Sequence, residues 1–207
     1  MITLTSIGEP LIAQMISRSK AVRQLLAETV PSAKLAVDTL KVADEVPLGQ
    51  CGEHWFDGAH KLDVALFIPE TTKCLGIEAK LGFDRLNKQD FEKRFLQPCR
   101  TSHGDTRVAG SMIAILEGRM PPALEGKPVS VRHAELDYLL LNEWVLIVRQ
   151  DTLQGWTQDQ RPDFTTRCIP LTFESIVGAY GGRDQFNALV SELIGGDYYQ
   201  EWMSRPQ

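Results

Sequence analysis

Two carboxylates and a lysine stand close together in one apolar-rich part of the sequence: Asp63, Glu78 and Lys80. Paired carboxylates can hold a divalent cation such as Mg²⁺, which commonly completes its octahedron with waters and phosphate oxygens. A bound cation lowers the pKa of a coordinated water, and a neighbouring lysine can orient that water, help deprotonate it or stabilise charge on a phosphate. These residue types therefore suit the hydrolysis of a phosphate ester.

Two apolar runs position these three residues. Residues 61–68 and 73–81 both show strand patterns, and the connection Pro69-Glu70-Thr71-Thr72 is short and polar. This arrangement predicts a β-hairpin. Because side chains alternate across a strand, Glu78 and Lys80 share one face. The other face is expected to enter the core, and it carries Ile77, Ala79 and Leu81.

The register of the hairpin decides whether the two carboxylates meet. If Pro69 pairs with Thr72, the residue numbers of all partners sum to 141, and Asp63 stands directly opposite Glu78. Directly opposed residues have Cβ atoms about 4.5–5.5 Å apart, so two facing carboxylates repel each other unless a cation joins them. A slip of one residue would place the carboxylates on opposite faces.

The spacing of these residues resembles that of a known family. Asp63, fourteen intervening residues and then Glu78-Ala79-Lys80 form a pattern similar to that of the PD-(D/E)xK nuclease superfamily, which has the restriction endonuclease fold. In that superfamily the Asp opens the second core strand and the E-x-K closes the third. Leu62 stands where the superfamily's name has a proline. The resemblance covers roughly residues 9–150, and the segment IPLTFESI near the C-terminus is also similar.

The resemblance implies a role for each residue of the motif. Asp63 and Glu78 would be metal ligands for Mg²⁺ (or Mn²⁺), the main-chain carbonyl of Ala79 a third ligand, and Lys80 the catalytic lysine. Many members add an acidic residue from the first helix, for which Glu9 is the first candidate and Glu28 the second. Some members also use a glutamine from the helix after E-x-K. Two are available there, Gln89 and Gln97.

A second set of residues suggests contact with nucleic acid. Residues 80–107 carry seven basic and four acidic side chains, although the whole chain has a formal net charge of -5. A basic helix beside a metal site could follow a phosphate backbone, and a solvated helix face of mixed charge is the alternative. The candidates for phosphate contact are Arg85, Lys88, Lys93 and Arg94. His54 and His60, in the loop before Asp63, are expected to have local roles.

Further elements are expected on both sides of the hairpin. An amphipathic helix is predicted for 9–29, a strand or short helix for 35–45, and a loop for 46–60 with a short strand near 53–56. After the hairpin, a helix is predicted for 84–100, a helix or strand for 107–118 and a proline-rich excursion for 119–130. A buried strand is predicted for 144–149, a loop for 151–165 and a further strand for 166–173. Two helices, 173–180 and 184–202, are expected at the end, the second interrupted near Gly195-Gly196.

This order of elements predicts an α/β or α+β fold with a central mixed sheet flanked by helices. With 207 residues, of which 43% are hydrophobic, the chain is expected to form a single nuclease-like domain over 1–207. Its restriction endonuclease-like core would span about 9–150, followed by a C-terminal helical extension over about 151–207.

Composition excludes several other classes of protein. The four cysteines form no C-x-x-C pair, which argues against a zinc ribbon or a redox motif. The sequence has no uncharged apolar stretch of about 18 residues and no recognisable signal peptide. The chain is therefore expected to be cytoplasmic, with no membrane partner.

The sequence leads to two hypotheses about function. The first is a metal-dependent nuclease that hydrolyses phosphodiester bonds, with DNA as the expected substrate. The alternative, favoured by the acidic net charge, is a catalytically inactive nuclease-fold protein that serves as a nucleic-acid-binding or assembly module. A third interpretation is an all-structural hairpin with an unrelated small-molecule pocket, in which the three residues are ordinary hairpin residues and Lys80 is the ion-pair partner of Glu78. DNA versus RNA, endo- versus exonuclease action and a homodimer all stay open.

Overall fold

The computed structural model describes residues 4–50, 61–68, 71, 73–81, 106–109, 137–154 and 168–195. Its helices are α1 (Leu4–Arg18), α2 (Lys20–Thr29), the 3-10 turn η1 (Pro31–Ala33), α7 (Gln150–Gln154), α9 (Phe173–Tyr180) and α10 (Arg183–Gly195). Its strands are β1 (Lys41–Gln50), β2 (Lys61–Ile68), β3 (Lys73–Lys80), β4 (Thr106–Ala109), β5 (Asp137–Val148) and β6 (Cys168–Thr172).

The strands form one mixed sheet, so the expected α+β class is confirmed. The strand order is β3-β2-β1-β4-β5-β6, with a further pairing between β3 and β5. Strand β2 is antiparallel to β1 and β3, whereas β5 is parallel to β3 and β6. The short strand β4 pairs antiparallel with the end of β1 and the start of β5. Strands β1 to β5 therefore close into a ring, and β6 extends it.

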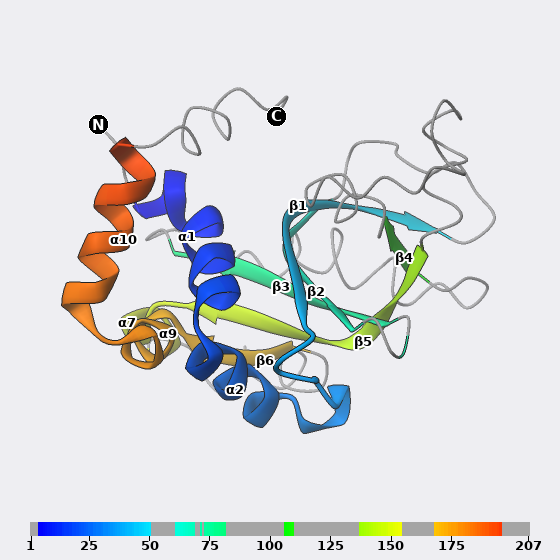
Figure 1. Cartoon of the computed structure of the whole chain (residues 1–207). Helices are drawn as coiled ribbons and strands as arrows, with labels where there is room; N and C mark the ends of the chain where they lie inside the picture. The colour runs from blue at the N-terminus through cyan, green and yellow to red at the C-terminus, as the bar shows by residue number, and fades with distance from the viewer. Residues whose placement is uncertain are drawn as a thin grey trace.

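The described helices gather on one side of the sheet, where α1 and α2 lie beside α9 and α10 (Figure 1). The apolar core lies between these helices and the strands. It includes Leu11 and Ile16 of α1, Val64 and Ile77 of the hairpin, and Ile176 of α9, all fully buried. Burying one such side chain contributes about 1.5–3 kcal/mol, so this contact fixes the hairpin against α1.

The N-terminal helix was predicted as a single element over 9–29, and that prediction is wrong at its start and middle. Two helices meet at Ser19, whose hydroxyl accepts a hydrogen bond from the backbone N–H of Val22 and so caps α2. The Arg23 guanidinium donates to the carbonyls of Ile16 and Ser17 at 3.1 and 2.7 Å, which satisfies the end of α1. Pro10 lies inside α1 rather than at its beginning.

The hairpin is confirmed, and so is its register. Five pairs, from Val64 with Ile77 to Ile68 with Lys73, all have residue numbers that sum to 141. The structure corrects the segment before the hairpin, because residues 46–50 belong to β1 and not to a loop. Pro47 lies just before the β1–β4 pairing begins at Leu48, so among the described strands its missing N–H interrupts no β1–β4 hydrogen bond.

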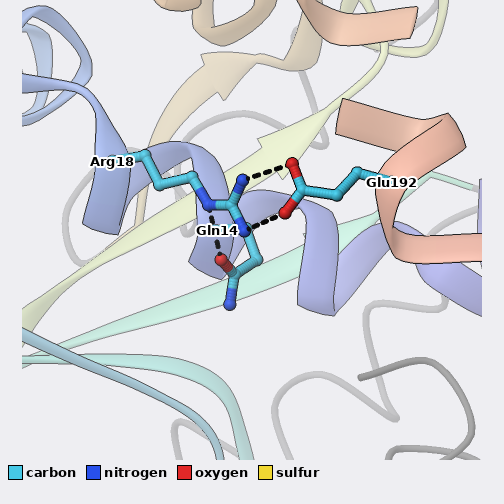
Figure 2. Close-up of polar contacts among 3 residues, drawn as sticks. All are labelled: Gln14, Arg18 and Glu192. Carbon is cyan, nitrogen blue, oxygen red and sulfur yellow. Dashed lines mark hydrogen bonds and ion pairs between the residues drawn. The ribbon is translucent and has the colours of Figure 1, made fainter. Parts of the chain in front are cut away.

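The C-terminal part contributes a strand and helices to the same sheet and core. Helix α9 has the bounds predicted for it, and Thr172 caps it by accepting from the N–H of Ser175 at 3.2 Å. Helix α10 is tied to α1 by Arg18, which donates to both carboxylate oxygens of Glu192 (Figure 2). The start of the predicted 151–165 loop is instead the short helix α7. The buried strand predicted for 144–149 begins earlier, at Asp137.

Other predicted elements lie outside the described residues. They are the strand near 53–56, the helix over 84–100, the remainder of 107–118, the 119–130 segment and the helix beyond residue 195.

Candidate metal centre on the hairpin

The candidate site lies on the face of the hairpin that points away from the helices. Ile77 and Ala79 belong to the helix-side core cluster. Glu78 and Lys80 alternate with them and therefore lie on the opposite face. The last β2–β3 pair is Val64 with Ile77, and the same register brings Asp63 opposite Glu78. The structure thus brings together the three residues that the sequence singled out.

Asp63 is held in place by the neighbouring strand. Its Oδ2 accepts a hydrogen bond from the backbone N–H of Ala79 at 2.7 Å. In a β-ladder, the N–H and C=O of one residue point to the same neighbouring strand. The Ala79 carbonyl is therefore expected on the same side of β3 as the Asp63 carboxylate, where it could contribute to a cation site.

Glu78 is the most deeply buried charged residue of the site, with 1% of its surface exposed. Its Oε1 forms an ion pair with the Lys80 ammonium. Its Oε2 is buried and has no hydrogen-bond partner within the described part of the chain. Burial raises the pKa of Glu78 well above its ordinary value, and the Asp63 carboxylate raises it further, against the opposing effect of Lys80. An unsatisfied buried polar group costs about 1–3 kcal/mol.

Lys80 forms an ion pair with the buried Glu78 carboxylate and is itself partly in solvent, with 42% of its side chain exposed. Burial of the ammonium lowers its pKa, but the charges of Glu78, Asp63 and Glu9 together outweigh that effect and leave the pKa raised. Lys80 is therefore protonated at neutral pH, and the charge it presents is accessible.

Of the two acidic residues proposed from the first helix, Glu9 lies near enough to act on the Lys80 charge. The reason is the close approach of α1 to the end of β3. A Cβ added to Gly8 would lie 2.7 Å from Leu81 Cδ1, so only glycine fits there without a shift of the leucine. Glu28 is exposed on α2, and its Oε1 accepts from Gln24 at 3.1 Å. That contact is local to its own helix.

Several predicted residues cannot be placed. Those outside the described residues are Gln89, Gln97, Arg85, Lys88, Lys93, Arg94, His54 and His60. Conversely, the sequence analysis did not single out Asp44, which is 5% exposed in β1. Asp44 pairs with Val64 and so lies on the helix side of the sheet, away from Asp63. In the sequence, Asp44 was marked only as an acidic residue within 35–45, the segment predicted as a strand or short helix.

The donor set fits a hard divalent cation. Asp63 and Glu78 offer two carboxylates side by side, and the buried Oε2 of Glu78 has no hydrogen-bond partner from the ranges that the structure describes. Among the described residues there is no group of three or more His, Cys, Asp or Glu side chains that could hold a metal ion. Mg²⁺ nevertheless commonly binds through one or two carboxylates and several waters. Two carboxylates with a main-chain carbonyl therefore match its usual protein ligands.

Comparison with known proteins gives no relative for this chain: no family model, no curated protein and no solved structure matches it. None of the helices within the described ranges is long and apolar enough to cross a membrane.

Proposed function

We propose that this chain is a metal-dependent nuclease that hydrolyses phosphodiester bonds in DNA. The proposal includes a hairpin of the PD-(D/E)xK type, Mg²⁺ or Mn²⁺ as the cofactor, nucleic acid as the partner and a cytoplasmic location. The superfamily places its Asp near the start of the second core strand and its E-x-K at the end of the third. Asp63 in β2 and Glu78–Lys80 in β3 occupy those places.

One observation carries the proposal: the Glu78 carboxylate is buried beside Asp63, and one of its oxygens has no hydrogen-bond partner among the described residues. Both burial and the second carboxylate disfavour its charged form. A fold selected for stability alone would place an apolar residue there, since replacing buried charges by apolar groups is often stabilising. A bound cation explains the arrangement, because it would supply the missing partner and remove the repulsion.

The roles follow from the geometry. Asp63 and Glu78 would hold the cation, with the Ala79 carbonyl as a third ligand. When bound, the ion lowers the pKa of a coordinated water and offsets charge on the phosphate. The protonated and half-exposed Lys80 can reach a phosphate from the solvent side and stabilise the charge that develops in the transition state. In the metal-free chain the charges of Glu78, Asp63 and Glu9 raise the pKa of Lys80, so its side chain is present as the ammonium. Glu9 helps to keep that charge in place.

The second candidate function is a catalytically inactive nuclease-fold module that binds nucleic acid. The direct ion pair between Lys80 and Glu78 favours it, because Lys80 occupies Glu78 Oε1 and supplies part of the charge that a cation would provide. A protein of this kind would bind DNA but would not cleave it.

The test is incubation of purified protein with linear and circular DNA, and separately with RNA, in Mg²⁺ or Mn²⁺. Lys80→Ala should reduce DNA cleavage at least about 100-fold, since removing one transition-state donor has an effect of about that size. Asp63→Asn should abolish cleavage, because it removes a carboxylate that holds the cation. Lys73→Ala is the matched control, because Lys73 is exposed at the other end of β3.

The outcomes separate the two candidates. Cleavage of circular as well as linear DNA identifies endonuclease action, and preferential cleavage of RNA corrects the substrate. Cleavage that survives both Asp63→Asn and Lys80→Ala rules out this site. DNA binding by the wild-type chain without cleavage in either metal selects the inactive module.

A further inference from the structure

Lys80 supplies a cation to Glu78 from within the chain. Its ammonium forms an ion pair with Glu78 Oε1, and the two residues lie on the same face at the end of β3. The Glu78 side chain is 2% exposed, so the ammonium reaches a carboxylate that is almost closed to solvent. Removing one partner of such a pair leaves a buried charge without compensation, which is strongly destabilising. Lys80 therefore serves first as the counter-charge of Glu78.

A divalent ion at this hairpin would compete with Lys80 for the same carboxylate. Glu78 is one of the two carboxylates proposed to hold the ion, and its Oε1 is already paired with the Lys80 ammonium. Two positive charges on one buried carboxylate repel each other strongly, because water and salt screen them less than at an exposed site. The Asp63 carboxylate is anchored differently, since its Oδ2 accepts from the neutral backbone N–H of Ala79 at 2.7 Å. The competition between the two cations therefore centres on Glu78.

Of the two partners in the ion pair, Lys80 is the one that can move. The Glu78 carboxylate is enclosed, whereas 42% of the Lys80 side chain is exposed. A lysine side chain is a flexible four-carbon stem that ends in a compact charge. The ammonium can therefore swing into solvent without a change in the backbone of β3. A charge released in this way is available to a phosphate oxygen, which is a strong acceptor for an ammonium.

We propose that Lys80 is a displaceable counter-ion: it neutralises Glu78 until a divalent cation binds there, and its ammonium then leaves Glu78 to bind a phosphate oxygen of the substrate. This inference rests on the proposed metal-dependent function. It adds an order to the events at the site, because an ammonium held on the buried Glu78 has less charge to offer a phosphate. Cation binding and phosphate binding thereby favour each other, since coupling between two ligands is reciprocal.

Mn²⁺ binding to the full chain after treatment with a chelator tests the competition, with free Mn²⁺ followed by electron paramagnetic resonance. Lys80→Met removes the internal cation and should lower the Kd about five-fold or more, the factor expected if the ion pair is present in about four-fifths of the molecules. Lys80→Arg keeps a cation and should leave the Kd close to that of the wild type. Lys73→Met, an exposed change at the other end of β3, is the matched control and should not alter the Kd.

Amine labelling of the wild-type chain tests the displacement itself. Acetylation of Lys80 by acetic anhydride, measured by mass spectrometry, should become about five-fold faster when Mn²⁺ is added, because the free fraction of the ammonium rises from about one-fifth. Acetylation of the exposed Lys73 should stay the same. Inorganic phosphate should slow the acetylation of Lys80 when Mn²⁺ is present and should have no such effect without it.

The outcomes separate this inference from the proposed function. A folded Lys80→Met whose Mn²⁺ affinity is no tighter than that of the wild type overturns the competition. Unchanged acetylation of Lys80 in a wild-type chain that binds Mn²⁺ overturns the displacement, whether or not that variant folds, and leaves the metal centre intact. Acetylation that phosphate does not slow overturns the phosphate-binding role of the released ammonium. A wild-type chain that binds no Mn²⁺ overturns the metal-dependent function as well.

Discussion

Two ion pairs in this molecule join a basic side chain to a glutamate, but in different surroundings. Arg18 donates to both oxygens of Glu192 at 2.8 and 2.7 Å and also contacts Gln14 at 2.9 Å, all on exposed helix surfaces (Figure 2). Lys80 bonds to one oxygen of Glu78, which is buried beside Asp63. In the first pair both carboxylate oxygens accept hydrogen bonds, whereas in the second one buried oxygen has no partner within the described part of the chain.

The pKa shifts of the two glutamates show the same contrast. The Arg18 hydrogen bonds and charge lower the pKa of Glu192, whereas burial and then Asp63 raise the pKa of Glu78 despite its ion pair. Arg18–Glu192 therefore serves to hold α10 on α1. The Lys80–Glu78 pair is poorly suited to stabilising the fold, which is the reason to look for a ligand there.

The largest expected effect is the stabilisation of the buried site by a divalent ion. Mg²⁺ at about 100 times its Kd should increase the free energy of unfolding by about 2.7 kcal/mol, by mass action. Thermal melts with and without Mg²⁺ measure this effect. Asp63→Asn should abolish the increase, and Glu192→Gln should not change it. An equal increase in Asp63→Asn would place the ion elsewhere.

Removal of the basic partner should have the next largest effect, and only at the buried pair. Lys80→Met should reduce the free energy of unfolding by roughly 2 kcal/mol without metal, because Glu78 is left buried with no positive charge beside it. This expected loss is smaller than that for breaking a fully buried ion pair, because 42% of the Lys80 side chain is exposed. Denaturant unfolding measures this reduction. If Lys80→Met loses no more unfolding free energy than Lys73→Ala, Lys80 does not offset the buried charge of Glu78.

The pH dependence of stability should have opposite signs at the two glutamates. The pKa of Glu78 in the folded chain is raised above the ordinary value of 4.5. As pH rises above 4.5, the unfolded chain therefore loses this proton before the folded chain does, and the free energy of unfolding falls until the pH reaches the folded pKa. Metal-free Glu78→Gln should therefore gain stability relative to wild type as pH rises above 4.5.

Glu192 provides the control for this experiment. Its pKa is lowered, so its contribution is present above the ordinary pKa and is lost as pH falls through the folded value. Glu192→Gln should differ from wild type most at neutral pH and least in acid. Unfolding curves at pH 4, 6 and 8 measure how the stability of each variant, relative to wild type, changes with pH. If Glu78→Gln and Glu192→Gln change in the same direction, the two glutamates do not differ in the way proposed.

The smallest effect is expected for the exposed pair itself. Arg18→Ala should change the Tm by no more than about 3 °C, and the difference should shrink at high salt because exposed ion pairs are screened. Calorimetric scans in low and high NaCl measure it. A larger decrease in Tm that does not depend on salt would mean that Arg18 stabilises the fold chiefly through packing.

The sequence predicted the hairpin well because its information is local. Two apolar runs and a short polar connection specify the β2–β3 register, and alternation then places Asp63 against Glu78. The division between α1 and α2 was missed because the apolar periodicity continues through Ser19, and only the hydroxyl cap and the Arg23 contacts mark the break. Local patterns do not reveal such side-chain caps reliably.

The rest of the site depends on long-range pairing. Pro47 and Gly49 made residues 46–50 resemble a loop, yet β1 pairs there with β2 and β4. Likewise, the approach of Glu9 to Lys80 depends on Gly8 packing against Leu81, at the contact between α1 and β3. Neither contact has a signature within a short window of sequence.

The most direct test of the central claim is a crystal structure of the full chain soaked in Mn²⁺, with anomalous diffraction data to locate the ion. An anomalous peak is expected between the Asp63 and Glu78 carboxylates, within coordinating distance of the Ala79 carbonyl, and it should be absent in Asp63→Asn crystals. A fully soaked wild-type crystal with no peak there, and with Lys80 still bonded to Glu78, would contradict the claim that this hairpin is a metal centre.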